Sequence, residues 1–309
     1  MVAGIGPAST GPAGAGPRAA AVGIAPIAFR GPWPAAGEAG ARSPRLWFNS
    51  VIDLHCHVLP GIDDGPDSIE GSIALARAAV STGIHTVVAT PHVSWRYPND
   101  TATIARLTEQ LNARLRAEDV TLDVRPGAEI AMTRVIDIEP SELARFGLGG
   151  GSWLLVEPPF TEVATGLDAI VRDLLRRGHH VLLAHPERCH ALRRDPRMLE
   201  SLIRDGVLTS ITAGSLVGHF GGEVRRFSLQ LARQGMIHNV ASDAHDHAQR
   251  PPGIAVELDR AGLGPLADWL TVDVPAAILA DEAIPPRPAV ALSFEGPRRR
   301  FWQTRRSRS

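Results

Sequence analysis

Histidine and acidic side chains stand at or just beyond the carboxyl ends of six short apolar segments of this chain. In the first segment, VIDLHCH, His55 and His57 flank a cysteine, and an Asp-Asp-Gly turn follows a few residues later. An isolated histidine on an apolar strand more often has an ordinary hydrogen-bond partner than a metal ion. Together, however, these segments supply five imidazoles and four carboxylates: His55, His57, Asp64, His92, Glu129, Glu157, His185, Asp243 and His245.

Such a set of side chains is suited to a cluster of metal ions. Four carboxylates that are brought together repel one another and are costly to bury unpaired, and several bound cations would compensate them. Imidazole and carboxylate ligands without thiolate suit Mn, Fe, Zn or Mg, and they disfavour a structural zinc site. The residue types therefore predict a polynuclear metal centre.

Cys56 lies between two of these histidines but is not expected to share their chemistry. Side chains alternate along a strand, so His55 and His57 project to one side and Cys56 to the other, where we predict that it packs against a helix. A cysteine-dependent tyrosine phosphatase would need an arginine six positions after its nucleophile. Ile62 and Asp195 stand at that spacing from the two cysteines of this chain, which excludes that chemistry.

The elements that carry these residues alternate between short apolar strands and amphipathic helices, which indicates a parallel α/β fold. One helix is predicted within the stretch 67–83, with Asp67 or Ser68 as its N-cap and Gly83 after its last turn. The same pattern predicts three more helices, which end at Gly178, Gly206 and Gly235.

The predicted strands number seven, because a further segment, LTSITAGS, joins the six that lead to candidate ligands. In a closed parallel barrel all carboxyl ends of the strands open onto one face. A doubly wound open sheet instead gathers its ligands at one switch point and would not bring six strand ends together. The pattern therefore favours a barrel.

The composition narrows the class of protein further. A chain of 309 residues with 44% hydrophobic residues can bury one large core. Its net charge of −1 gives no overall attraction to nucleic acid or anionic membranes, so no nucleic-acid partner is expected. The chain contains no lysine, which excludes Schiff-base and phosphate-loop lysine chemistry. Two cysteines are too few for a disulfide framework and favour a reducing cytoplasm.

The two ends of the chain differ from its middle. Residues 1–47 are rich in Gly, Ala and Pro and are expected to be disordered, although a start codon assigned too far upstream would look the same. Breakers every few positions leave no run long enough for a signal sequence or a membrane span. Residues 291–309 form an Arg-rich tail, which we expect to be solvated rather than to bind phosphate or a membrane surface. Residues 48–290 remain as the folded domain.

The chain resembles a known superfamily in a series of motifs: DLHCHVLPGIDDG, GIHTVVATPH, PGAEI, LVEPPF, AHPER, TAGSLVGHFG and IHNVASDAHDHAQRP, with a terminal DVPAAILADEAIP. This is the polymerase and histidinol phosphatase (PHP) superfamily. More closely, the motifs are similar to those of its bacterial metal-dependent protein-tyrosine phosphatases, which regulate capsular polysaccharide. The resemblance covers Val51 to Ile284. It implies a distorted (β/α)7 TIM-like barrel, the PHP fold, with a trinuclear metal centre.

The resemblance also implies roles for particular residues. The three ions would be Mn, with Fe or Zn as alternatives. Their implied ligands are His55, His57, Glu129 and Asp243 for the first ion, Glu129 as a bridge with Glu157 and His185 for the second, and Asp64, His92 and His245 for the third. The implied phosphate-binding residues are Arg188 and Arg250. The chain departs from its relatives after two ligands, in GAEIAMT and VSWRYPND.

The activity implied by the resemblance is hydrolysis of phosphotyrosine by metal-activated water, with the two arginines gripping the phosphoryl oxygens. The implied substrate is the flexible tail of a bacterial tyrosine kinase that controls capsular or exopolysaccharide synthesis. Two alternatives remain open. A small-molecule phosphatase, such as a histidinol-phosphate phosphatase, would use the same metals, because fold and metal site alone do not determine a substrate. A non-catalytic, metal-binding regulatory module is the other, although the presence of all nine ligands and both arginines argues against it.

Overall fold

The structure is a computed structural model that describes residues 51–162 and 164–292. The predicted N-terminal extension, residues 1–47, lies outside the described residues, and so do residues 293–309 of the predicted tail. Within the described part of the chain, no helix is both long enough and apolar enough to cross a membrane.

The strands of the described residues form parallel sheets, as the sequence predicts. Their bounds are β1 (Val51–Cys56), β2 (Ile84–Ala89), β3 (His92–Val93), β4 (Asp123–Pro126), β5 (Glu129–Ala131), β6 (Trp153–Glu157), β7 (His180–Ala184), β8 (Leu208–Thr212) and β9 (Asn239–Ala241). One sheet has the order β1-β2-β4, and the other has the order β3-β5-β6-β7-β8-β9. Every ladder between these strands is parallel.

Two of the seven predicted strands are interrupted near their carboxyl ends. β2 and β3 are separated at Pro91, which has no N–H to donate to a ladder, and β4 and β5 are separated at Gly127. A Cβ atom at Gly127 would lie 2.6 Å from the side chain of Val88, so the close approach of the two strands there requires glycine. Pairing resumes beyond both breaks with His92 opposite Glu129, so the interruptions bring two candidate ligands to adjacent positions.

The first strand also meets the segment that follows the last strand. An isolated parallel bridge joins Cys56 to Ala244. The backbone N–H of His57 donates to the carbonyl of Ala244 at 2.9 Å, and the N–H of Asp243 donates to the carbonyl of His55 at 2.9 Å. The ligand-bearing ends of β1 and β9 therefore lie side by side.

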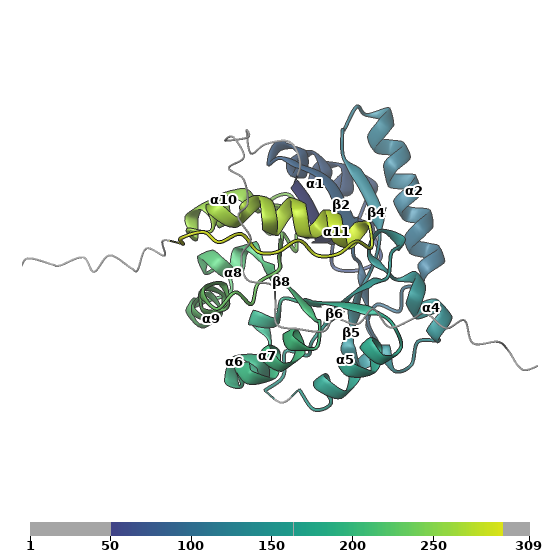
Figure 1. Ribbon diagram of the computed structural model, residues 1–309. Helices are drawn as coiled ribbons and strands as arrows, with labels where there is room; N and C mark the ends of the chain where they lie inside the picture. The colour runs from purple at the N-terminus through teal and green to yellow at the C-terminus, as the bar shows by residue number, and fades with distance from the viewer. Residues whose placement is uncertain (1–50, 163, 293–309) are drawn as a thin grey trace, which may run out of the picture.

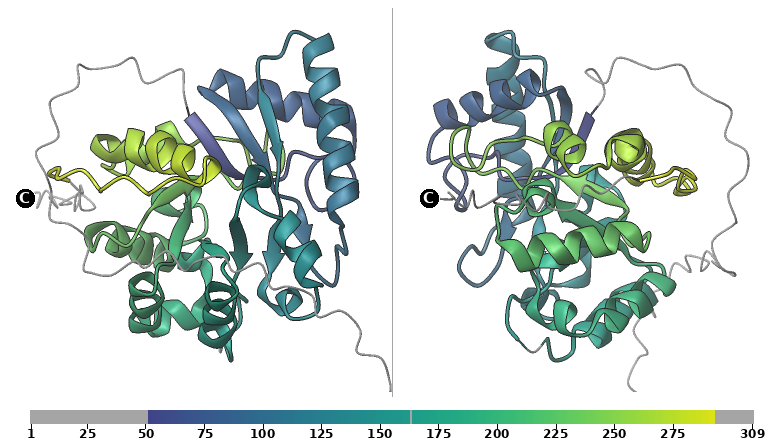
Figure 2. Two further views of the ribbon diagram at one scale, coloured as in Figure 1. Left: turned by 45° about the vertical axis from the view of Figure 1, so that its right-hand side comes forward. Right: turned by 90° about the vertical axis from the view of Figure 1, so that its left-hand side faces the viewer.

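Helices surround the strands on the outside (Figures 1 and 2). Their bounds are α1 (Ile69–Ser81), α2 (Thr101–Ala117), α3 (Met132–Val135), α4 (Pro140–Arg145), α5 (Leu167–Arg176), α6 (His190–Arg194), α7 (Pro196–Arg204), α8 (Ala213–Val217), α9 (Gly222–Arg233), α10 (Ala255–Arg260) and α11 (Val274–Leu279). Short 3-10 turns η1 (Leu148–Gly150), η2 (Pro186–Arg188) and η3 (Gly264–Leu266) and a π-helical turn η4 (Trp269–Asp273) complete the described elements. Strand β7 is buried on both faces, because Val181, Leu182 and Leu183 are all fully buried.

The helix boundaries predicted from the sequence are confirmed. Ser68 is the N-cap of α1, and its Oγ accepts a hydrogen bond from the N–H of Gly71 at 3.2 Å. Gly83, after the end of this helix, has a φ of +87°, which is the left-handed conformation that glycine adopts most readily. The three other predicted helices correspond to α5, α7 and α9.

Cys56 is a buried packing residue outside the candidate metal groups, as predicted, while its packing against a helix stays a prediction. Its side chain is buried within the apolar core, and its Sγ lies 3.7 Å from the carbonyl oxygen of Ala244. Burial raises the pKa of the Cys56 thiol well above its ordinary value, so the group is uncharged and unreactive at neutral pH.

We therefore expect Cys56→Ser to fold and to bind metal normally. The hydroxyl in an apolar site should lower the free energy of unfolding by about 1–2 kcal/mol. Urea denaturation measures this change, and metal analysis of the folded variant is the second measurement. A folded Cys56→Ser protein that has lost its metal would contradict the packing role.

Candidate metal centre

The structure brings all nine predicted metal-ligating residues to one place. β1 carries His55 and leads directly into His57. His92 and Glu129 are the first residues of β3 and β5, and Glu157 is the last residue of β6. The other four residues lie in the loops that follow β1, β7 and β9: Asp64, His185, Asp243 and His245. Among the described residues, four groups have ligand atoms within 4.8 Å of one another, and together these groups contain the nine predicted residues and no others.

The four groups share members, so the site is one continuous cluster. They are His55–His57–Asp243, His55–Glu129–His185, His92–Glu129–Glu157 and His57–Asp64–His92–His245. The grouping differs in detail from the ligand sets that the resemblance implies. His57 belongs to the group of Asp64, His92 and His245 as well as to the group that contains Asp243. Glu129 and Glu157 belong to one group with His92.

Glu129 lies at the centre of the cluster, where its carboxylate contacts four imidazoles. Its Oε1 is 2.7 Å from Nε2 of His185. Its Oε2 is 3.1 Å from Nε2 of His55, 3.3 Å from Nε2 of His57 and 3.0 Å from Nδ1 of His92. Burial alone would raise the pKa of Glu129, but the surrounding imidazoles lower it well below its usual range. Glu129 is therefore a buried anion.

Asp243 joins the cluster to two arginines. Its Oδ1 lies 3.6 Å from Nε2 of both His55 and His57. Its Oδ2 accepts hydrogen bonds from Nη1 of Arg188 and Nη2 of Arg250, both at 2.8 Å. Asp243 has a φ of +52°, an uncommon conformation for a residue with a side chain, which the surrounding contacts must maintain. The strain falls at the residue that connects the candidate ligands to the candidate phosphate-binding groups.

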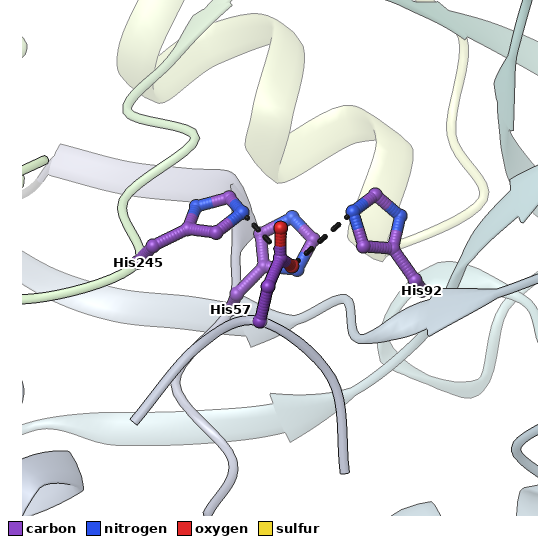
Figure 3. A group of neighbouring side chains, drawn as sticks. His57, His92 and His245 are labelled. Atoms are coloured by element: carbon purple, nitrogen blue, oxygen red, sulfur yellow. Dashed lines mark ion pairs between the residues drawn. The ribbon is translucent and has the colours of Figure 1, made fainter. Parts of the chain in front are cut away.

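The outer part of the cluster is formed by three imidazoles around Asp64. Figure 3 shows the rings of His57, His92 and His245 gathered around one carboxylate. The Oδ1 of Asp64 lies 3.4 Å from Nε2 of His92 and 3.3 Å from Nε2 of His245. The side chain of Asp64 is 47% exposed, whereas that of Glu129 is fully buried. The cluster therefore runs from the interior to the surface, where a substrate can reach it.

Ordinary hydrogen bonds leave some of the buried polar atoms of the cluster unsatisfied. Among the described residues, Nδ1 of His185 is buried without a hydrogen-bond partner, and Oε2 of Glu129 forms no well-aligned hydrogen bond although three imidazole nitrogens lie within 3.3 Å of it. Burial lowers the pKa of His185 to about 4, which keeps its imidazole in the neutral form that binds metals. Burial and the neighbouring charge of Glu129 raise the pKa of Glu157 to about 8. Bound cations would compensate these groups, so the donor set fits a metal centre.

Asp63 supports the cluster and was missed by the sequence analysis, which selected only its neighbour Asp64. Its Oδ2 lies 2.7 Å from Nδ1 of His57 and accepts the backbone N–H of His92 at 3.1 Å. A carboxylate on the far nitrogen of a ligating histidine fixes the tautomer and the ring orientation. The Asp-Asp doublet was the available signal, but its two members cannot be distinguished without the loop conformation.

Asp53 is the second supporting residue that was missed. It is fully buried and accepts hydrogen bonds from the N–H of His55 at 3.2 Å and from the N–H of Ser242 at 3.0 Å. Its other oxygen accepts the Ser242 hydroxyl. Asp53 therefore holds the start of the ligand-bearing segment of β1 against the loop that carries Asp243. The signal in the sequence was the alternation that places Asp53 on the same side as His55 and His57.

Replacing Glu129 by Ala should lower the number of metal ions bound per chain, because two groups of the cluster lose a shared carboxylate. Elemental analysis of protein purified without chelator measures this number. Glu129→Gln tests the charge at nearly constant shape, and Glu109→Ala, which removes an exposed glutamate from α2, is the control. Full metal content in both Glu129 variants would show that this assignment is wrong.

Asp63→Asn should weaken metal binding by about 10- to 100-fold without removing a ligand from the cluster. The reason is that the amide cannot hold the tautomer and orientation of His57 as the carboxylate does. Competition with a chelator of known affinity measures the change. An affinity equal to that of the unaltered protein would contradict an orienting role for Asp63.

Comparisons with known proteins agree with this chemistry. The sequence pattern of the family described as "Capsular polysaccharide synthesis, CpsB/CapC" matches residues 51–260. The tyrosine-protein phosphatase YwqE of Bacillus subtilis is 40% identical over 197 residues, which are 63% of this chain and 78% of that protein. The tyrosine-protein phosphatase CpsB of Streptococcus pneumoniae is 29% identical over 251 residues, which are 76% of this chain and 100% of that protein.

A solved structure is similar over the same region. It comes from work on YwqE from Bacillus subtilis and CpsB from Streptococcus pneumoniae, which are described there as metal-dependent tyrosine phosphatases. The match has a TM-score of 0.68 at 35% identity and covers 78% of this chain and 100% of that chain. Since the family pattern spans more than half of the chain, this protein belongs to the CpsB/CapC family of capsular polysaccharide synthesis.

Proposed function

We propose that this chain is a metal-dependent protein-tyrosine phosphatase. The observation that carries the proposal is the convergence of nine imidazole and carboxylate side chains into one cluster, with Arg188 and Arg250 bound to its edge through Asp243. The names of the relatives support the choice of tyrosine phosphate among phosphate esters.

We propose three metal ions, Mn first with Fe or Zn as alternatives, held by the nine residues His55, His57, Asp64, His92, Glu129, Glu157, His185, Asp243 and His245. The support is an all-nitrogen and oxygen donor set in four overlapping groups, with Glu129 shared between two of them. When bound, such ions supply Lewis acidity that activates water at neutral pH and neutralises charge on the phosphoryl group.

Arg188 and Arg250 would bind the non-bridging oxygens of the phosphate. Each guanidinium carries five N–H donors, and the bonds to Asp243 use only part of them. The Arg188 side chain is 20% exposed and that of Arg250 is 34% exposed, so both are accessible from solvent while Asp243 holds them in place. Donors that are oriented before the substrate arrives stabilise the transition state most effectively.

We propose that the two parallel sheets form one closed, distorted (β/α)7 barrel of the PHP type. The support is the pairing on both sides of the two interruptions, together with the bridge between Cys56 and Ala244 that links β1 to the segment after β9. A closed barrel explains why the strand ends meet at one centre.

The substrate that we propose is a phosphotyrosine in a flexible tail of a bacterial tyrosine kinase that controls capsular or exopolysaccharide synthesis. The phosphotyrosine of a flexible tail can enter the cluster as far as a residue as deeply buried as Glu129. A phosphotyrosine fixed in a folded surface could not, because its protein would clash with the loops around the cluster. We place the reaction in the cytoplasm, consistent with two cysteines that are both free.

Arg188→Ala should reduce kcat/KM on a phosphotyrosine peptide by about 100-fold or more and leave metal content unchanged, because it removes stabilisation of the transferring phosphoryl group. Arg250→Ala should behave similarly, with a larger share of the loss in KM if it binds the phosphate before reaction. Steady-state kinetics on the peptide and on histidinol phosphate, with metal-replete protein, measure both effects. A preference of the unaltered enzyme for histidinol phosphate, or an Arg188→Ala enzyme of normal speed, would refute the proposal.

A further inference from the structure

The guanidinium group of Arg188 contacts two phenyl rings. Its guanidinium carbon is 4.8 Å from the ring centre of Phe160, which follows β6, and 4.5 Å from the ring centre of Phe220, which precedes α9. Cations are attracted to aromatic faces, so both rings stabilise the orientation in which Arg188 reaches Asp243. Neither phenylalanine was singled out in the sequence, because the contacts join segments that lie far apart along the chain.

The two rings also bound a pocket. It has a volume of about 460 Å³, and its lining includes Phe160, Phe220 and Val224 as apolar walls, with Arg188 and His190 as polar groups. None of the nine cluster residues lines it. Arg188 belongs both to the pocket and to the contacts of Asp243, so the pocket adjoins the place where a phosphate would be held.

Phe160 provides a second connection between this pocket and the cluster. Its ring stacks on the imidazole of His185, with ring centres 5.4 Å apart and an interplanar angle of 28°. The side chain is still 42% exposed, which is unusual for a large apolar residue of this chain. An exposed ring that touches both a candidate metal ligand and a candidate phosphate-binding arginine lies where the group attached to the phosphorus must pass.

We propose that Phe160 and Phe220 form the binding pocket for the aryl group of the phosphate ester and thereby select aryl over alkyl phosphates. The inference rests on the proposed function, and it deepens it by assigning the substrate's ring to particular residues. A phosphate held by Arg188 has its ester substituent at the mouth of the pocket, and flat aromatic rings pack well against phenyl walls. The volume leaves room for the ring and for adjacent peptide atoms.

The test compares two ligands that carry the same charged head. Phenylphosphonate and methylphosphonate differ in the ring alone, so the ratio of their dissociation constants isolates the contact with the pocket. Isothermal titration calorimetry on the metal-loaded full chain measures both constants without requiring turnover. The unaltered protein should bind phenylphosphonate about 10-fold or more tightly than methylphosphonate.

Phe160→Leu and Phe220→Leu should each reduce that preference several-fold, and the double substitution should nearly abolish it. Loss of packing on Arg188 weakens both ligands together and so leaves the ratio unaffected, which separates the two roles of the rings. Phe160→Tyr keeps an aromatic wall and should retain the preference. Trp95→Leu is the matched control, because Trp95 is an exposed aromatic residue after β3 that contacts Arg134 instead of Arg188.

Equal affinity of the unaltered protein for the two phosphonates would overturn the inference. The same conclusion would follow if Trp95→Leu reduced the ratio as much as Phe160→Leu, or if neither phenylalanine variant changed it. Kinetics on a phosphotyrosine peptide report separately on the proposed function. A protein that prefers phenylphosphonate but does not hydrolyse the peptide would refute the activity while retaining the pocket.

Discussion

The contact of the Glu129 carboxylate with four imidazoles is the interaction on which the rest of the site depends. A charged carboxylate without exposure to water is costly unless surrounding groups compensate it. That requirement explains why three strands, β1, β3 and β7, bring four histidines to within 3.3 Å of one carboxylate. The interruptions at Pro91 and Gly127 contribute to the same contact, because pairing resumes beyond them with His92 opposite Glu129.

The charges of the cluster are arranged in a sequence from the interior to the edge that carries Arg188 and Arg250. Glu129 is innermost, Asp243 lies next to it with one oxygen toward His55 and His57, and its other oxygen receives Arg188 and Arg250. Because one carboxylate contacts both imidazoles and guanidinium groups, changes in the charge of the cluster act directly on the arginines. In the proposed function, metal binding and phosphate binding would thus be connected through the single side chain of Asp243.

Aromatic residues complete the arrangement at the surface. Phe160 and Phe220 both contact the guanidinium group of Arg188, and Tyr97 stacks on His92 with an interplanar angle of 9°. These rings limit the orientations available to groups that would otherwise be mobile at the rim. In the proposed function, the charged groups would set the chemistry, and the rings around them would shape the space for a substrate.

The amino-acid sequence by itself determined the nine cluster residues, the parallel α/β fold, the ends of α1, α5, α7 and α9, and the burial of Cys56 as a packing residue. All of these follow from patterns that are local in the chain: alternation along a strand, apolar periodicity along a helix, and polar residues at strand ends. Only the tertiary structure decided that Asp63 contacts His57 while Asp64 contacts His92 and His245. It alone also decided that Asp53 binds Ser242 and that two phenylalanines contact Arg188. These contacts join segments up to 189 residues apart or depend on loop conformation, and no periodic pattern specifies which atoms meet there.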